Sequence, residues 1–132
     1  MTIKIETLSP AAEKGKLNTE WILLVNEGEG PFNTEGCSIT TQRGKGRPSV
    51  ASPLKAGLIL QPGERVRLVT GSSGRGSHGA APEEEGVRNF YLFLKAPYLD
   101  KPGLVVRLMN RQHEVCKATY EAKPAAGAVD AG

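Results

Sequence analysis

The glycine-rich segment at residues 71–79 offers the first side chains and backbone groups that could do chemistry. Within it, Gly74-Arg75-Gly76-Ser77-His78-Gly79 satisfies G-x-G-x-x-G, a pattern whose glycines let the backbone approach a dinucleotide pyrophosphate. That site needs the motif to open a helix, with an acidic residue about 20 positions further on. Ala80-Ala81-Pro82 follows instead, and serine stands at position 77 where a P-loop needs lysine. We therefore predict no nucleotide site and no cofactor.

Histidine and cysteine are the next residue types that could build a site. His113 and Cys116 are separated by an odd number of positions, which on a strand sends two side chains to opposite faces. His78 and Cys37 lie in remote segments, and the chain has no C-x-x-C pair. We predict no metal site, with the histidines in a turn and a loop and the thiols in the core.

A hydrolytic triad would require a serine, a histidine and a carboxylate to converge. Ser72, Ser73, Ser77 and His78 share a loop with the acidic run at residues 83–85, but no G-x-S-x-G nucleophile elbow is present. A small hydrolase therefore ranks last among the functions considered. We predict no catalytic residue, and we expect that the protein is not an enzyme.

The elements that must position any site are predicted to be short. The chain has 132 residues, including 16 glycines and 9 prolines, which suits one domain of strands and turns better than long helices. Its start lacks the apolar segment of a secretory signal, and no apolar run approaches the roughly 20 residues of a membrane helix. We expect a soluble, cytoplasmic protein that has no membrane partner.

Two predicted strands are apolar on both faces. In residues 21–25, Ile22 and Leu24 point one way while Trp21, Leu23 and Val25 point the other. Residues 90–94 have the same two-sided character. Strands of this kind must be covered on both sides, so the sequence predicts an all-β fold, an antiparallel β-sandwich of about seven to nine strands.

Turn residues separate the other predicted strands. Pro62-Gly63 is typical of the centre of a type II turn, because proline presets the first φ and glycine accepts the positive φ of the second. Residues 104–108 and 114–120 are predicted to form a closing hairpin. We expect one domain over residues 1–120, followed by a disordered tail at 121–132 that is rich in alanine, glycine and proline.

The two cysteines fall in separate predicted strands. Cysteines would be denser in a small secreted scaffold, so buried free thiols at Cys37 and Cys116 are the favoured interpretation. A bridge between the two sheets is the alternative, and it would require a suitable Cα separation.

Several short motifs carry a resemblance to a known family. They are Glu20-Trp21-Ile22 with Leu24 and Asn26, Gly36 with the strand to Ile39, Leu58, Leu60, Pro62 and Gly63 before Val66 and Leu68, the small-residue loop from Gly71 to His78, and Val106-Arg107-Leu108 with Glu114-Val115. Together they resemble the lamin tail domain, an immunoglobulin-like β-sandwich, over about residues 3–120. The resemblance implies a non-enzymatic module that binds other proteins, and it brings no catalytic residues with it.

Three departures separate this chain from the family. Cys37 stands where the family often has tryptophan, and Asn110-Arg111-Gln112-His113 replaces a polar D-x-x-G turn. The filament-forming rod of the lamins does not precede the motifs in this sequence. We therefore infer no role in a nuclear lamina from the resemblance.

The leading site hypothesis is an apolar interface. If Ile22 and Leu24 enter the core, the other apolar side chains of their strand form a stripe on the outer face of the sheet. The predicted interface residues are Trp21, Leu23, Val25, Tyr91 and Phe93. A protein partner or a second copy would bind there, and no small-molecule substrate is expected. The alternative is that the amino-terminal segment or residues 49–56 cover the stripe within the molecule.

The second hypothesis rests on charge. The net charge is +3, but residues 36–79 hold seven basic residues and one acid, a local charge of 7 − 1 = +6. Basic loops attract phosphate through electrostatics that salt screens. The alternative function is weak, salt-sensitive nucleic-acid or anion binding through loops 43–47 and 71–79, against the simpler interpretation of solvated charges. The predicted contact residues are Arg43, Lys45, Arg47, Arg65, Arg67 and Arg75.

Overall fold

The protein is all-β over the residues that the computed structural model describes, which are 3–11, 15–54, 57–72, 78–99 and 102–121. The elements are β1 (Ile3–Ser9), η1 (Leu17–Thr19), β2 (Trp21–Asn26), β3 (Phe32–Asn33), β4 (Cys37–Arg43), β5 (Ser49–Pro53), β6 (Ile59–Leu60), β7 (Arg65–Val69), β8 (Val87–Tyr91), β9 (Leu104–Asn110) and β10 (His113–Thr119). The predicted all-β fold class is confirmed. The only described helix, η1, has three residues, and none is long and apolar enough to cross a membrane.

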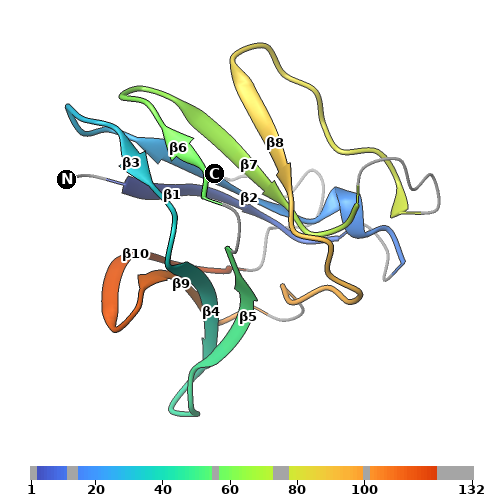
Figure 1. The fold of residues 1–132 in the computed structure, drawn as a ribbon. Helices are drawn as coiled ribbons and strands as arrows, with labels where there is room; N and C mark the ends of the chain where they lie inside the picture. Colours follow the sequence, from blue (N-terminus) through green and yellow to red (C-terminus); the bar gives the residue numbers. More distant parts are fainter. Residues whose placement is uncertain (1–2, 12–14, 55–56, 73–77, 100–101, 122–132) are drawn as a thin grey trace, which may run out of the picture.

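Two four-stranded sheets form the layers of a β-sandwich (Figure 1). The first sheet has the order β1-β2-β7-β8, the second has the order β10-β9-β4-β5, and β3 pairs with β6 separately. Among the described strands every pairing is antiparallel except that of β7 with β8, which is parallel. The antiparallel prediction therefore needs one correction, at β8. The ten described strands exceed the seven to nine expected because β3 and β6 form a pair of their own.

Inward-facing aliphatic side chains fill the space between the two sheets. Ile22 and Leu24 of β2 are fully buried, as are Ile39, Val106 and Leu108 of the second sheet. Each such side chain contributes about 1.5–3 kcal/mol when it leaves water. The alternation predicted for residues 21–25 is confirmed on this inner face.

A single buried amide fixes the corner at the end of β2. The Nδ2 atom of Asn26 donates hydrogen bonds to the carbonyl oxygens of Gly30 and Leu60, each at 2.9 Å, and its Oδ1 atom accepts one from the N–H of Gly28 at 2.8 Å. The backbone carbonyl of Asn26 accepts a hydrogen bond from the N–H of Gly63 at 2.7 Å. Asparagine suits this place because its amide supplies two donors and one acceptor group.

The turn between β6 and β7 is the type II turn that the sequence predicts. The N–H of Glu64 donates to the carbonyl of Gln61 at 2.9 Å, and Gly63 has a φ of +81°. The Glu64 carboxylate accepts a hydrogen bond from the Gln61 N–H at 2.8 Å, which lowers the pKa of Glu64 below its usual value. The predicted closing hairpin is also confirmed, as β9 pairs with β10 around a turn in which Arg111 has a φ of +57°.

The two long sides of the sandwich differ in whether the edge strands of the two sheets pack against each other. On one side β1 of the first sheet packs against β10 of the second, which closes the layers. On the other side β5 and β8 are the edge strands of their sheets. The predicted strand at residues 90–94 is wrong at its end, because β8 stops at Tyr91 and Phe93 has a φ of +58°. Of the predicted tail at 121–132, residues 122–132 lie outside the described residues.

Candidate functional site

The outer face of the first sheet carries three of the five predicted interface residues. Leu23 and Val25 are only 8% and 4% exposed, so neither side chain is open to a partner. Trp21 is half-buried beneath Arg67, whose guanidinium carbon lies 4.6 Å from the centroid of the indole ring. This geometry is a cation–π contact. The stripe on β2 is therefore largely covered within the molecule.

Arg67, which lies over Trp21 on this face, is itself 3% exposed. Its Nη2 atom donates to Glu84 at 2.8 Å, and its Nη1 atom donates to Oδ1 of Asn89 at 3.1 Å and to the carbonyl of Pro82 at 3.2 Å. Residues 82–84 thus fold back over the outer face and are held there by a buried cation. They belong to neither of the two segments considered as covers, the amino terminus and residues 49–56.

Tyr91 and Phe93, the other two predicted residues, lie in a different place. They border an apolar groove of about 420 Å³ at the open side of the sandwich. The lining residues are Ser52, Pro53, Phe90, Tyr91, Leu92, Phe93 and Leu94. The groove thus joins the end of the edge strand β5 to the segment that follows the edge strand β8, and no charged side chain lines it.

Phe93 is the most exposed large residue of this groove, at 63%. Its backbone is fixed, because the N–H groups of Leu92, Phe93 and Leu94 donate to the carbonyls of Val69, Gly71 and Thr70 at 2.7, 2.9 and 2.8 Å. A φ of +58° is unfavourable for an aromatic residue by about 1–2 kcal/mol. The structure therefore holds this ring in water in a strained conformation.

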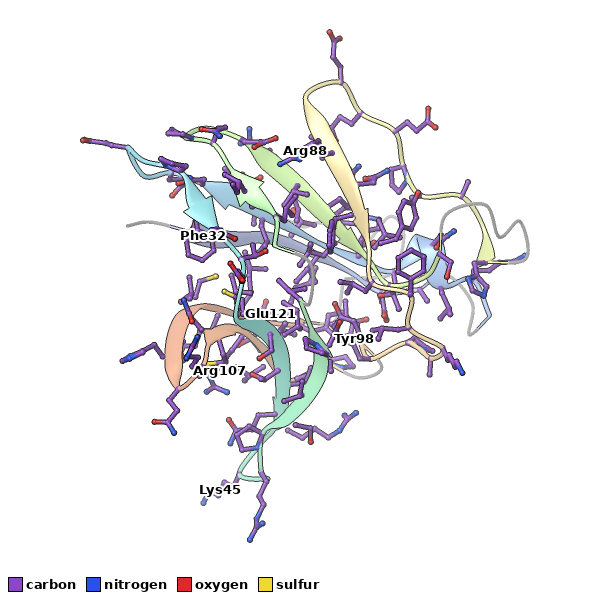
Figure 2. All side chains as sticks on the ribbon, in the orientation of Figure 1. Phe32, Lys45, Arg88, Tyr98, Arg107 and Glu121 are labelled. Atoms are coloured by element: carbon purple, nitrogen blue, oxygen red, sulfur yellow. The ribbon has the colours of Figure 1, made fainter. Side chains whose placement is uncertain are left out.

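A buried carboxylate supports the segment that follows the groove. The Oε1 atom of Glu20 accepts hydrogen bonds from the hydroxyl of Thr70 at 2.7 Å and the N–H of Tyr98 at 3.1 Å, and its Oε2 atom accepts one from the N–H of Leu99 at 3.0 Å. Burial, together with the Glu20 charge, raises the pKa of the Tyr98 phenol (Figure 2). Sequence reasoning missed this role, although a glutamate directly before an apolar strand was a signal for it.

The predicted anion-contact residues do not gather in one place. Arg43, Lys45 and Arg47 are exposed around the tip of the β4–β5 hairpin, where Figure 2 shows Lys45 far from the first sheet. Arg65 and Arg67 lie on β7 in that other sheet, and both are engaged with carboxylates. The Arg65 contact, at 2.8 Å, lowers the pKa of Glu6.

The second predicted basic loop is only partly described. Arg75 and the other residues from 73 to 77, including most of the G-x-G-x-x-G match, lie outside the described residues. The two ends of this loop are held together, because Nδ2 of Asn18 donates to the carbonyls of Ser72 at 3.0 Å and Gly79 at 3.1 Å.

The residue types that could hold a metal or act as nucleophiles are dispersed. Within the described ranges, no three histidine, cysteine or acidic side chains form a group that could hold a metal ion. Cys37 and Cys116 are both free thiols, as the favoured interpretation of the sequence had it. Cys37 is buried in the core as predicted, but Cys116 is only partly buried. Burial raises the pKa of both, that of Cys116 to about 11, so few thiolates form near neutral pH.

No model of a protein family matches this chain, and no curated protein matches it. The fold and the surface alone therefore define the class of protein, which is an all-β sandwich with an exposed apolar groove on the side where two edge strands meet solvent.

Proposed function

We propose that this protein is a non-enzymatic protein-binding module with an immunoglobulin-like fold of the lamin-tail type, and that its partner docks at Phe93 and the adjoining groove. Two observations support the fold assignment. The chain forms two packed four-stranded sheets, and residues that carry the resemblance hold buried positions in it. Glu20 and Asn26, for example, are fully buried and hydrogen-bonded to backbone groups.

The single observation that supports docking is the state of Phe93. A large aromatic ring that is 63% exposed gains little from folding, and its left-handed backbone makes the folded state less stable. Aromatic side chains are enriched among the residues that dominate binding energy at protein interfaces. Burial of this ring by a partner would recover the hydrophobic free energy that the free protein forgoes.

The test compares two residues that share the same backbone conformation. Phe93→Gly and Arg111→Gly each relieve a positive φ, and we expect each to raise the free energy of unfolding by up to about 1 kcal/mol. Only Phe93→Gly removes the proposed anchor. Proteins captured by the wild type and by Arg111→Gly should therefore be lost with Phe93→Gly, as measured by quantitative mass spectrometry of pull-downs. An unchanged set of captured proteins with Phe93→Gly would rule out docking at this groove.

A second candidate function is weak nucleic-acid or anion binding by the β4–β5 hairpin. The observation that favours it is the exposure of Lys45 and Arg47 at the hairpin, in a stretch that contains no acidic residue from 36 to 54. Such binding would fall steeply with added salt. Fluorescence anisotropy of labelled duplex DNA at two salt concentrations tests it, with Lys45→Glu and Arg47→Glu as the variants. Absence of binding at the lower salt concentration would remove this candidate.

A further inference from the structure

Three features of the edge strand β5 indicate what kind of partner could bind to it. We propose that β5 takes up an extended acidic peptide as an additional strand, with an apolar side chain of the peptide seated in the groove beside Phe93. This inference rests on the proposed function, because the same groove receives the anchor. It adds the conformation of the partner, its charge and the spacing between its two kinds of contact.

The backbone of β5 provides the first feature. Among the described strands β5 pairs only with β4, through residues 49–53, so its other side has no strand neighbour. An edge of this kind presents N–H and C=O groups that an added strand can pair with. The remaining sheet edges are less open, since β1 packs on β10 and residues 82–84 fold back to β8, where Glu84 bridges to Val87.

Exposure along β5 is the second feature. Val50 is 63% exposed, as large a fraction as Phe93. A β-branched residue on a free edge offers a cross-strand neighbour to an incoming strand. Pro53, which ends β5 and lines the groove, has no N–H to donate, so the ladder is confined to Ser49–Ser52.

The third feature is the difference in polarity between the two ends of β5. The Pro53 end meets the apolar groove, and the Ser49 end directly follows the hairpin that carries Lys45 and Arg47. No acidic residue occurs from 36 to 54, and Lys95 follows the groove-lining segment. A partner that runs along β5 therefore meets an apolar site at one end and positive charge at the other.

The length of β5 sets the spacing within the partner. A strand of this length spans about 16 Å at roughly 3.3 Å per residue. The apolar anchor of the peptide and its acidic residues should thus be separated by roughly four to six positions. A second copy of this chain would present the same basic hairpin and lacks the complementary charge on this edge, so a peptide of another protein fits better.

Selection from a random library tests this directly. Peptides of 12 residues displayed on phage would be selected on the immobilised wild-type protein. We expect enriched sequences to combine an aromatic or large aliphatic residue with two or more acidic residues at the predicted spacing. Enrichment of basic or uncharged peptides would overturn the inference.

A charge-reversal pair provides the matched control. Val50→Lys and Val50→Glu remove the same exposed apolar group and differ only in the sign of the new charge. We expect the selected peptide to bind the glutamate variant roughly fivefold or more weakly than the lysine variant, because like charges on adjacent strands repel. Equal affinities, measured by fluorescence polarisation with circular dichroism as the check of folding, would contradict acidic strand addition at β5.

Amide hydrogen exchange separates this inference from the function on which it rests. Strand addition should slow exchange at Ser49–Ser52 when the peptide binds. Peptides that require Phe93 but leave these amides unprotected would overturn strand addition and keep the binding function. A library without any enriched peptide would argue against both. Self-association through β5 in sedimentation velocity, or single-stranded DNA that protects the same amides, would replace the peptide as occupant and overturn the inference.

Discussion

Individual polar side chains form hydrogen bonds to backbone groups that strand pairing leaves without a partner. Asn26 joins the turn after β2 to the turn before β7, and the hydroxyl oxygen of Thr34 accepts a hydrogen bond from the N–H of Leu58 at 2.9 Å. Glu20 receives the N–H groups of Tyr98 and Leu99. All three side chains are fully buried, where an unmade hydrogen bond is unfavourable by about 1–3 kcal/mol. These three residue types are therefore required by the backbone groups to which they are hydrogen-bonded.

The glutamate predicts a residue-scale effect on stability. Glu20→Gln keeps the size of the side chain, but its amide N–H₂ group would face one of the groups that now donate a hydrogen bond to the carboxylate. We expect the free energy of unfolding to fall by about 2 kcal/mol, measured by urea denaturation. Glu27→Gln, at an exposed position, is the control and should leave the midpoint unchanged. Equal midpoints for the two variants would show that the buried carboxylate contributes nothing.

At the scale of one element, β7 carries two arginines of opposite character. Arg65 is exposed and pairs with Glu6 of β1 in the same sheet, whereas Arg67 is buried between Trp21 and residues 82–84. The two positions are both on the outer face of the same strand. Their difference arises from what folds over them, since only Arg67 lies beneath the returning segment.

This contrast predicts unequal effects of the same substitution. Arg67→Ala should lower the free energy of unfolding by about 3 kcal/mol, because it strips a buried set of charged hydrogen bonds. It should also speed amide exchange in residues 82–86, measured by mass spectrometry. Arg65→Ala should produce a much smaller loss and no change in that segment. Similar losses for both variants would mean that the returning segment is not held by Arg67.

The elements that were predictable are those specified by local pattern. Alternation in residues 21–25 predicts a buried Ile22 and Leu24, and Pro62-Gly63 predicts its turn, because each depends on neighbours in the sequence. The burial of Arg67 depends on residues 15 or more positions away, which alternation does not describe. The end of β8 was mispredicted because Phe93 is a residue type that favours strands, and its positive φ is imposed by hydrogen bonds to residues 69–71. Of the candidate site, the sequence predicts residues but not the groove that brings β5 beside them.

At the scale of the whole molecule, the reactivity of the two thiols depends on whether the second sheet is closed. Cys37 lies on the inner strand β4 and is 3% exposed, and Cys116 lies on the edge strand β10 with its pKa raised by burial. Neither thiol reacts readily while the sheet is closed, because reaction requires an accessible thiolate.

Thiol labelling therefore predicts a single cooperative event. With excess Ellman's reagent at pH 8, both thiols should react in one slow phase whose denaturant dependence matches that of global unfolding. Cys116→Ala should remove half the amplitude and leave the rate of the remaining phase unchanged. A separate fast phase that disappears in Cys116→Ala would mean that β10 opens independently of the sandwich.

The edge position of β8 has a consequence for how activity would respond to heat. β8 is paired with β7 alone among the sheet strands, its residues are only partly buried or exposed, and it leads directly into Phe93. For an edge strand with so few buried contacts, the free energy of local unfolding is lower than that of the core. Warming should thus open a temperature interval in which spectroscopy still records intact sheets while the capacity to capture a partner has already gone.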